Sequence, residues 1–442
     1  MMFGPRRWKT RALPMRSEAS GWYEILPAPP PEARPVHGRV ACDWAIVGAG
    51  ACGLATARRL AELRHQDTIA LIDAARIGYG ASGRNAGFML NHNTHGEIKG
   101  LNIERRNSAL CAAGVDYLRR LVHENQIPCQ WSDWGRLYVA ADRAGSDHLA
   151  ELARNYRRLD AACSWVEPEQ LHDMLGTAFY TRAIHARGSA LVQPAALMRG
   201  LGTTLPANVS VYEESPVLDV SFGARARLTC PEGVVVARNL ILANSVFAEE
   251  MGVARWRVVP IATYASLTRP LTPEERSRLG RECEFGLLPA DPNGSTLRLT
   301  RDQRLFVRNS FSYARTKRIE LRALDRAERR HRRALRRRWP ELGDVPFVST
   351  WGGMLGFTRN DGTLFGRVTD GVYAVISSDA GPVARGTAGG KLLAEHVCGV
   401  RSELLEIMLS LPRAGLLPPD PFLRIIVNHR LQRIERDGAG EL

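Results

Sequence analysis

The chain has 442 residues, of which 45% are hydrophobic and 24% are charged, a balance that excludes wholesale disorder and a fibrous repeat. This length predicts two to three domains with a sizeable core. The apolar runs, such as residues 68–75, are as long as strands, and none approaches the roughly 18 apolar residues of a membrane-spanning helix. Residues 6–11 are basic but no apolar stretch follows them, so we expect no secretory signal.

The net charge of +14 is concentrated in one segment. Residues 315–338 hold eleven arginines and one lysine against three acidic residues, a local charge of +9 that leaves only +5 for the rest of the chain. Leu321, Leu324, His331 and Leu335 recur there at helical spacing, which predicts an amphipathic helix with an arginine-rich outer face. We interpret that face as a solvated surface; contact with an anionic surface, a nucleic acid or an acidic partner is the alternative.

The chain contains eight cysteines and no CxxC pair. Several of them, such as Cys52 and Cys398, stand in apolar surroundings. Buried free thiols in a reducing compartment are the interpretation that we favour, so we predict a cytoplasmic protein. We predict no metal site.

Residues 1–40 have the composition of an extended arm, because five prolines fall within residues 27–35. Trp22 and Tyr23 are the side chains available to anchor this arm on the body of the protein. We expect ordered structure to begin at about Asp43.

A βαβ unit opens the body of the chain. Residues 43–47 and 68–72 are short apolar runs typical of buried parallel strands, and residues 51–64 between them have helical character. Further along, the pattern predicts helices over 97–125, 146–160 and 382–398, strands over 136–140, 209–220, 238–243 and 371–376, and more alternating strands over 258–268 and 297–309. The last basic amphipathic segment, residues 424–436, is expected on the surface.

Gly48, Gly50 and Gly53 form a GxGxxG pattern between the first strand and the first helix of this unit. The first glycine allows a tight turn, the second lets a pyrophosphate approach the backbone, and the third permits close packing of helix on strand. The helix N-terminus offers free N–H groups and a partial positive charge to the phosphates. Asp73 ends the second strand, where its carboxylate accepts hydrogen bonds from a ribose diol and repels a 2′-phosphate. We therefore predict a dinucleotide site that disfavours NADP.

Residues 78–87 form a long loop of small residues directly after Asp73. A nicotinamide dehydrogenase has no need of such a loop, whereas in flavoproteins it runs along the pyrophosphate and ribityl chain. At this point the sequence resembles the D-amino-acid-oxidase-like flavoproteins, the group that includes glycine oxidase and sarcosine oxidase. Within that group, the Ala-Ser-Gly-Arg-Asn of residues 81–85 is most similar to gamma-glutamylputrescine oxidase-like amine oxidases.

The resemblance continues in order from about residue 40 to about residue 400. Two positions depart from the family pattern. Of the glycines usual before the last helix, only Gly381 remains within residues 377–382, and Asn244-Ser245 replaces a more usual glycine-containing turn. Both departures bear on the substrate pocket and not on the adenine half of the site. The similar segments are 191–201, 211–217, 240–244, 298–306, 351–362 and 385–395.

The resemblance implies an α/β fold in which a Rossmann-like FAD-binding domain of the glutathione-reductase type carries an inserted substrate domain built on an antiparallel sheet. The expected divisions are an N-terminal arm over 1–40, a discontinuous FAD-binding domain over 41–95, 186–255 and 345–400, the substrate domain over 96–185 and 256–344, and a C-terminal extension over 401–442.

The resemblance also implies the residues that hold the cofactor. FAD is expected without a covalent bond, because nothing marks a cysteine or histidine as an attachment point. The expected cofactor-binding residues are Gly48, Gly50, Gly53, Asp73, Ala74, Ser82, Gly83, Arg84, Asn85, Val217, Ala243, Asn244, Gly381, Pro382, Val383 and Ala384.

The catalytic residues are not identified by the sequence. The candidates for the substrate site are Phe88, His92, Tyr264, Trp351 and Asp379. The last four have ordinary structural alternatives, namely a polar surface loop, a strand position, core packing and a helix cap. Three further residues are arginines that would pair with a substrate carboxylate, and the sequence leaves open which of them does so: Arg301, Arg304 and Arg308.

The function that the resemblance implies is oxidation of a C–N bond of a small-molecule amine or amino acid to an imine, which water then cleaves to a carbonyl product. Oxygen is the expected electron acceptor. The first alternative is a dehydrogenase of the same fold that passes electrons to a quinone or a protein partner, with peripheral membrane contact. The second alternative is a flavoprotein that binds RNA or an anionic surface through residues 315–338, although we expect no nucleic-acid partner.

Overall fold

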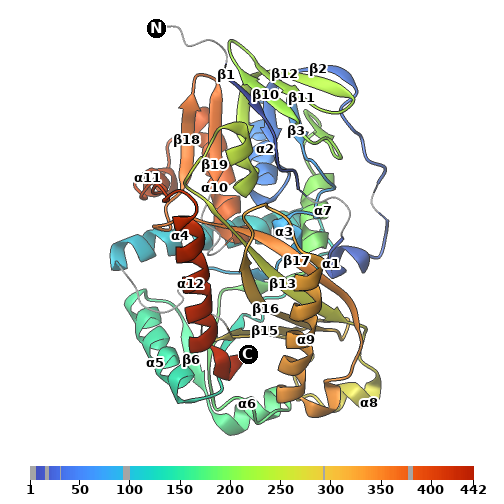
Figure 1. Ribbon diagram of the computed structural model, residues 1–442, viewed down its shortest axis with the longest axis vertical. Coiled ribbons are helices and arrows are strands. Elements are labelled where there is room, and N and C mark those ends of the chain that lie inside the picture. The colour runs from blue at the N-terminus through green and yellow to red at the C-terminus, as the bar shows by residue number, and fades with distance from the viewer. Residues whose placement is uncertain (1–5, 15–18, 30, 93–99, 292–293, 377–381) are drawn as a thin grey trace.

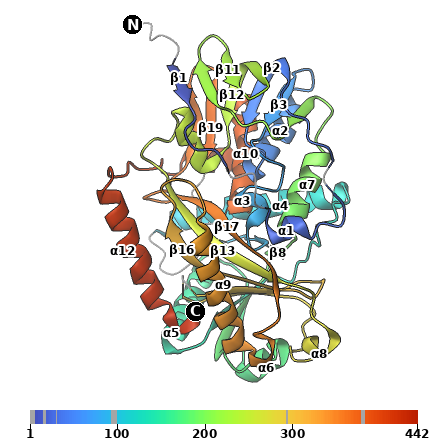
Figure 2. The same ribbon diagram turned by 45° about the vertical axis from the view of Figure 1, so that its right-hand side comes forward.

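Two large β-sheets at opposite ends of the molecule form the framework of the protein (Figures 1 and 2). The computed structural model describes residues 6–14, 19–29, 31–92, 100–291, 294–376 and 382–442. The first sheet has nine strands and the second has eight. The fold is therefore mixed α/β, as the sequence predicts.

The predicted βαβ unit forms the centre of the first sheet. Its strands are parallel, with Trp44 paired to Ile69 and Val47 paired to Ile72. Short apolar runs suit these strands because helices cover one face of the sheet and a second apolar cluster covers the other. The elements of the unit are β2 (Gly38–Val47), α2 (Ala51–Leu63) and β3 (Ile69–Ile72).

The rest of the first sheet comes from distant parts of the chain. Three of its strands add in parallel to the central unit: β9 (Val209–Tyr212) beside β3, β12 (Gly233–Leu242) beside β2, and β19 (Val372–Ile376) beside β12. Antiparallel strands complete it: β1 (Arg6–Lys9), β10 (Asp219–Phe222), β11 (Ala226–Thr229) and β18 (Leu364–Thr369).

Close helix packing covers one face of this sheet. Helix α10 lies against α2 and α4, and two glycines allow the approach. A Cβ atom on Gly390 would lie 2.1 Å from the carbonyl oxygen of Cys52, and one on Gly114 would lie 1.9 Å from that of Ala384. The helices on this face are α2, α4 (Leu101–Glu124), α7 (Pro194–Thr203) and α10 (Pro382–Val397).

The second sheet is antiparallel except where β14 and β5 run parallel. Its order is β17 (Phe347–Phe357), β13 (Val259–Thr268), β16 (Leu305–Tyr313), β15 (Thr296–Leu299), β14 (Phe285–Pro289), β5 (Arg136–Ala140), β7 (Arg182–Ala186) and β6 (Cys163–Val166). Helices α6 (Pro168–Leu175) and α9 (Leu321–Arg338) pack on its outer face, and α5 (Arg143–Arg158) packs on the opposite face.

One expected domain boundary differs from the structure. We expected residues 345–357 in the FAD-binding part, but β17 pairs with β13 over ten residues and so belongs to the second sheet. The division into domains otherwise remains a prediction.

The expectation that ordered structure begins at about Asp43 was wrong. Strand β1 pairs with β10, β2 already starts at Gly38, and the short helix α1 (Gly21–Glu24) brings Trp22 into the core with 1% of its surface exposed. Elements of four residues are too short to show a periodic pattern, so composition alone made this segment resemble a free arm.

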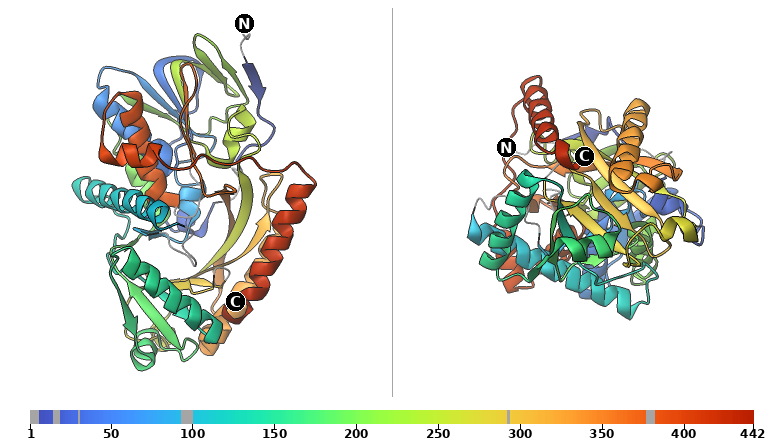
Figure 3. Two further views of the ribbon diagram at one scale, coloured as in Figure 1. Left: turned by 90° about the vertical axis from the view of Figure 1, so that its left-hand side faces the viewer. Right: turned by 90° about the horizontal axis from the view of Figure 1, so that it is seen from below.

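The arginine-rich helix and the C-terminal helix α12 (Phe422–Asp437) both contact strand β16 of the second sheet, and α12 runs along the outside of the molecule (Figure 3). The predicted helix over the arginine-rich segment is confirmed as α9, whose buried side includes Ala327, His331 and Leu335. An ion pair of 2.5 Å joins Arg330 of α9 to Glu435 of α12. Smaller helical elements are α8 (Pro273–Arg276), α11 (Glu403–Leu409), η1 (Ser245–Met251), η2 (Pro340–Leu342) and η3 (Ala439–Glu441). In the part of the chain that the structure describes, no helix is long and apolar enough to cross a membrane.

Candidate cofactor and substrate site

The glycine turn between β2 and α2 has the geometry that the GxGxxG pattern predicts. Gly48 has a φ of +103°, and a Cβ atom on it would lie 2.7 Å from the carbonyl oxygen of Ala243. A Cβ atom on Gly53 would lie 1.7 Å from the carbonyl oxygen of Gly48. Neither position accepts a larger residue, since the collisions are with backbone. Gly50 is the N-cap of α2 and has no side chain of its own to cap the helix, so the positive end of the helix dipole at this turn suits an anion.

Asp73 stands beside this turn at the end of β3. Its Oδ2 accepts a hydrogen bond of 2.7 Å from the N–H of Ala49, and its Oδ1 accepts one of 2.9 Å from the N–H of Ala75. Burial raises the pKa of this carboxyl to about 6. Asp73 and the neighbouring Ala74 both keep some accessible surface. The carboxylate is thus fixed next to the turn with acceptor capacity left for a diol.

The small-residue loop folds back onto the start of α2. The Oγ of Ser82 accepts a hydrogen bond of 3.0 Å from the N–H of Ala51. The Asn85 amide donates to the carbonyl oxygen of Ser82 at 2.6 Å and accepts from the N–H of Gly87 at 2.7 Å. The loop includes the short helix α3 (Ala81–Arg84), which contains Gly83. It therefore lines the same helix end as the glycine turn.

The remaining expected cofactor residues lie around the same edge of the first sheet. The N–H of Ala243 donates to the carbonyl oxygen of Val47 at 2.9 Å, and Asn244 follows it with a buried Oδ1 that has no partner in the described residues. The carbonyl oxygen of Val217 accepts from the hydroxyl of Thr10 at 2.7 Å, a contact from the N-terminal segment. The buried Oδ1 of Asn244, which has no partner among the described residues, fits a site in which a bound group supplies the missing hydrogen-bond donor.

Helix α10 begins at Pro382, and the next two residues are buried in the same apolar cluster as Ala51. Those residues are Val383 and Ala384, 2% and 1% exposed. Gly381 and Asp379 lie outside the described residues. Together, the N-terminus of α2, the tight glycine turn, the fixed carboxylate and the Asn244 Oδ1, which lacks a partner among the described residues, fit FAD.

Two reciprocal contacts join the small-residue loop to the second sheet. The indole N–H of Trp351 donates to the carbonyl oxygen of Arg84 at 3.1 Å, and Nη1 of Arg84 donates to the carbonyl oxygen of Gly352 at 3.0 Å. Trp351 is 1% exposed. This substrate-site candidate is therefore packed in the core and directly attached to the small-residue loop of residues 78–87, which we also call the cofactor loop.

Trp22 of the N-terminal segment completes this junction, a role that sequence reasoning missed. Its indole N–H donates to the carbonyl oxygen of Asn85 at 2.9 Å. Its ring stacks on Phe306 at 5.2 Å and lies 6.3 Å from the ring of Trp351. The aromatic pair Trp22-Tyr23 was the available signal, and it indicated an anchor without locating it.

The structure separates the other substrate-site candidates. Phe88, in β4 (Phe88–Met89), lies against Gly286 of the second sheet, on the side that holds Trp351. Tyr264 lies on the opposite face, where its hydroxyl bonds Ser312 at 2.6 Å and its ring joins the cluster of Ala323 and Ala327 of α9. The candidates therefore do not form one cluster.

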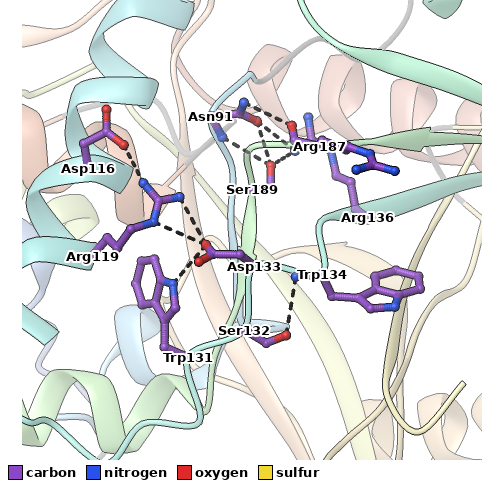
Figure 4. Close-up of polar contacts among 10 residues, drawn as sticks. All are labelled: Asn91, Asp116, Arg119, Trp131, Ser132, Asp133, Trp134, Arg136, Arg187 and Ser189. Carbon is purple, nitrogen blue, oxygen red and sulfur yellow. Dashed lines mark hydrogen bonds and ion pairs between the residues drawn. The ribbon is translucent and has the colours of Figure 1, made fainter. Parts of the chain in front are cut away.

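His92 lies at a buried polar cluster built around Arg136. Figure 4 shows Arg136 with Asn91 and Ser189 of this cluster. Arg136 has no exposed surface and donates to Tyr138 at 3.1 Å, to Asn91 at 3.2 Å and to the carbonyl oxygen of His92 at 3.1 Å. Burial, and then the charge of Arg136, lower the pKa of His92 to about 4. An arginine opening the apolar run 137–140 was the sequence signal for this cluster, and it was not used. The other acceptors of Arg136 are Ser189 and Tyr156.

A separate set of contacts in Figure 4 fixes the segment before β5 to α4. Asp133 accepts hydrogen bonds from Arg119 at 3.1 Å and from the indole of Trp131 at 3.1 Å. Arg119 is also paired with Asp116 of its own helix at 2.6 Å. Within the described ranges, no group of three His, Cys, Asp or Glu side chains is arranged to hold a metal ion.

The glycine turn, the carboxylate at the end of β3 and the loop that folds over the helix end define a dinucleotide-binding protein of the flavoprotein class. The family model described as FAD dependent oxidoreductase matches residues 43–396. The chain belongs to this family, and it is an FAD-dependent oxidoreductase.

The chain is similar to several characterised proteins. It is 25% identical over 389 residues to gamma-glutamylputrescine oxidoreductase from Escherichia coli (strain K12), with 84% of this chain and 87% of that protein covered. The fold is similar to that of glycine oxidase from Geobacillus kaustophilus, with a TM-score of 0.66, 18% identity, and 82% of this chain and 96% of that chain covered. It is similar as well to that of L-proline dehydrogenase from P. horikoshii, with a TM-score of 0.66, 14% identity, and 84% and 96% covered. The predicted family and the predicted FAD are confirmed.

Proposed function

We propose that this enzyme oxidises the C–N bond of an amine or amino acid to an imine, which water hydrolyses to a carbonyl product. The observation that carries the proposal is the attachment of the cofactor loop to the second sheet through Arg84, Trp351 and Gly352. This attachment sets the inner face of the second sheet against the FAD site, where a substrate would lie. The three similar proteins named above are named for an amine or for amino acids.

The residues present suit this chemistry without an acid–base triad. FAD, when bound, supplies the hydride acceptor, while the protein supplies binding and orientation. The N–H groups at the start of α2 would hold the pyrophosphate, and Asp73 would hold the ribose. Phe88 and Trp351 lie on the side of the second sheet that faces the cofactor loop, and there they would exclude water from the substrate.

Oxygen is the electron acceptor that we propose. A dehydrogenase that uses a quinone or protein acceptor is the second candidate, because one similar fold is that of a glycine oxidase and another is that of an L-proline dehydrogenase. A non-covalent FAD, the substrate-site roles and a cytoplasmic location remain predictions.

The experiment is an anaerobic screen of amines, polyamine derivatives and amino acids for bleaching of the FAD absorbance. Bleaching by one of these compounds supports the proposed reaction, and no bleaching by any of them contradicts it. Admitting air to the bleached sample then tests the acceptor. Rapid return of the absorbance with one equivalent of peroxide per turnover indicates an oxidase, whereas slow return indicates another acceptor.

A further inference from the structure

Helix α12 presents large apolar side chains to solvent in its first two turns. Phe422, Ile425 and Ile426 are 62%, 63% and 54% exposed. Their spacing of three and four residues places them on one side of the helix. A group of exposed apolar side chains of this kind marks a place of contact with a protein or a membrane.

The same side of α12 is basic in its later turns. Helical spacing continues from Phe422 to His429, Arg433 and Arg436, and all three of these side chains are exposed. Arg430, next to His429, is exposed as well. We call this side of the helix the outer face of α12. It consists of Phe422, Ile425, Ile426, His429, Arg430, Arg433 and Arg436.

Contacts beyond both ends of the helix hold α12 in place. Before the helix, Asp420 pairs with Arg315 at 2.6 Å. After it, Arg338 donates to the carbonyl oxygen of Glu441 at 2.7 Å. None of the residues of α12, all of which the structure describes, is buried, and the helix runs along the outside of the molecule (Figure 3). The outer face is therefore held in a fixed orientation without a partner from the second sheet.

The segment that leads into α12 adds two exposed apolar side chains. Leu416 is 59% exposed and Trp256 is 47% exposed. The N–H of Leu417 donates to the carbonyl oxygen of Trp256 at 2.7 Å, which holds the two segments together. Tryptophan is a side chain that favours the boundary between lipid and water.

We propose that the outer face of α12 docks on the surface of an anionic phospholipid membrane. A helix of this kind lies in the plane of the interface, with its apolar side chains below the headgroups and its arginines at the lipid phosphates. The helix lies after residues 43–396, which the family model matches, so the shared fold of the family does not account for it. The inference goes beyond the proposed function and does not depend on it.

The charges of the outer face disfavour a second copy of the chain as its partner. A two-fold contact brings the same face of two copies together, so the arginines of one copy would oppose those of the other. The acids of the helix do not offset this, because Glu435 pairs with Arg330 at 2.5 Å and Asp437 pairs with Arg433 at 3.7 Å. A nucleic acid would match the arginines but would leave the three apolar side chains in water.

The test is sedimentation of the FAD-loaded protein with vesicles in about 0.1 M salt. One set contains phosphatidylglycerol and phosphatidylcholine in equal parts, and the other contains phosphatidylcholine alone. The wild type should bind the anionic vesicles about 100-fold more tightly, since each arginine near an anionic surface contributes about 5-fold. The preference should shrink in about 0.5 M salt, because screening weakens the attraction.

The first variant combines Phe422→Gln, Ile425→Gln and Ile426→Gln. It should bind the anionic vesicles about 10-fold or more weakly than the wild type, because the apolar insertion is lost. Its FAD content and thermal midpoint should match the wild type, since the replaced side chains are exposed. Trp165→Gln is the matched control, because Trp165 is 37% exposed on β6, the edge strand at the far end of the second sheet from β17.

The second variant combines Arg430→Gln, Arg433→Gln and Arg436→Gln. It should lose about 100-fold in affinity for the anionic vesicles while its weak binding to phosphatidylcholine vesicles stays the same. Failure of the wild type to bind anionic vesicles would overturn the proposal, as would equal binding by the wild type and both variants. A lower thermal midpoint in the apolar variant would show that these side chains only hold the helix on the body, and would also overturn it.

Two further outcomes would replace the membrane by another partner. A dimer in sedimentation velocity that dissociates in the apolar variant would identify a second copy of the chain as the occupant. Equally tight binding of the wild type to both kinds of vesicle would overturn the role of the arginines. All of these measurements are made without turnover, so the anaerobic bleaching screen tests the proposed function separately.

Discussion

The indole N–H of Trp351 donates a hydrogen bond of 3.1 Å to the carbonyl oxygen of Arg84, and the guanidinium of Arg84 donates one of 3.0 Å to the carbonyl oxygen of the next residue, Gly352. These two bonds connect the loop beside the dinucleotide turn to the middle of β17 in the other sheet. We therefore expect binding of the cofactor to be coupled to the position of the second sheet.

Trp351→Phe should weaken this connection while keeping most of the packing against Trp22 and Phe306. The carbonyl oxygen of Arg84 loses its donor, which costs about 1–3 kcal/mol of the free energy of unfolding. FAD affinity should fall in the same variant. Urea denaturation and FAD titration measure the two effects. Trp165→Phe, at a tryptophan that is 37% exposed, is the control. Equal effects at both positions would show that the bond has no special role.

Asp73→Ala should lose FAD on purification. The carboxylate accepts from Ala49 and Ala75 and has acceptor capacity left for the ribose, so its removal loosens the turn and deletes a ligand contact. A hydrogen bond to a charged group contributes about 1.5–3 kcal/mol, or roughly 10- to 150-fold in affinity. The ratio of FAD absorbance to protein absorbance, followed by titration, measures the loss. Asp370→Ala is the surface control, and undiminished FAD binding by Asp73→Ala would contradict the ribose assignment.

His331 should make the protein less stable in acid. It is fully buried between α9 and the second sheet, where its Nδ1 bonds the hydroxyl of Ser266 at 2.7 Å, and burial lowers its pKa to about 3. The unfolded chain takes up a proton below a pKa of about 6.5, whereas the folded protein does not until about pH 3. The free energy of unfolding should therefore fall with decreasing pH between these values, by at most about 1.4 kcal/mol per pH unit from this residue.

Urea midpoints at pH 7.5, 6 and 5 measure this dependence. His331→Gln should flatten the pH profile while lowering stability at neutral pH, because the packing changes. His429→Gln, at an exposed histidine of α12, should leave the profile unchanged. An unaltered acid slope in His331→Gln would contradict the assignment.

Substitution of a buried arginine of α9 should lower the free energy of unfolding, whereas substitution of an exposed one should hardly change it. Arg338 is 2% exposed and donates to the carbonyl oxygens of Ala334 and Glu441 at 2.9 and 2.7 Å. Arg338→Gln leaves buried acceptors unpaired and should cost about 3 kcal/mol or more of the free energy of unfolding. Arg333→Gln, on the exposed side of the same helix, should change it by less than about 0.5 kcal/mol.

The exposed arginines also test the anion-binding alternative. Replacing Arg329 and Arg333 by Gln should leave FAD content and turnover of a soluble amine unchanged if that face is only solvated. Retention on heparin that falls steeply with salt in the wild type and disappears in this double variant would instead favour a nucleic acid or anionic surface as partner.

The dinucleotide site was predictable because its determinants are local. Gly48, Gly50, Gly53 and Asp73 occupy 26 consecutive residues of one βαβ unit, and each has a backbone requirement or a charge that no distant residue has to supply. Strand burial and helix spacing in this unit follow from the same short stretch. The remaining cofactor residues came from the family resemblance.

The tertiary structure decided which side chains of the second sheet face the small-residue loop. Whether Tyr264 or Ala265 faces the cofactor loop depends on the register of β13 against β16, and that register shifts between Thr263 and Tyr264, opposite Ser310 with its φ of +65°. A shift of one residue turns every following side chain to the other face. A single sequence does not carry this information, because the shift depends on the pairing of residues more than forty positions apart, such as Tyr264 and Asn309.

Contacts between distant segments also distinguish the three arginines from one another and fix the position of the N-terminal segment. Arg301, Arg304 and Arg308 have the same chemistry in sequence. Only the fold gives two of them carboxylate partners and leaves Arg308 without one among the described residues. The sequence places Trp22 in a proline-rich arm, yet in the fold its ring packs against Phe306 and Trp351, far along the chain. The sequence by itself determined the dinucleotide turn and its carboxylate, since their physics is local. The tertiary structure decided which side chains of the second sheet face the small-residue loop, since pairing and burial arise from segments that meet only in the folded state.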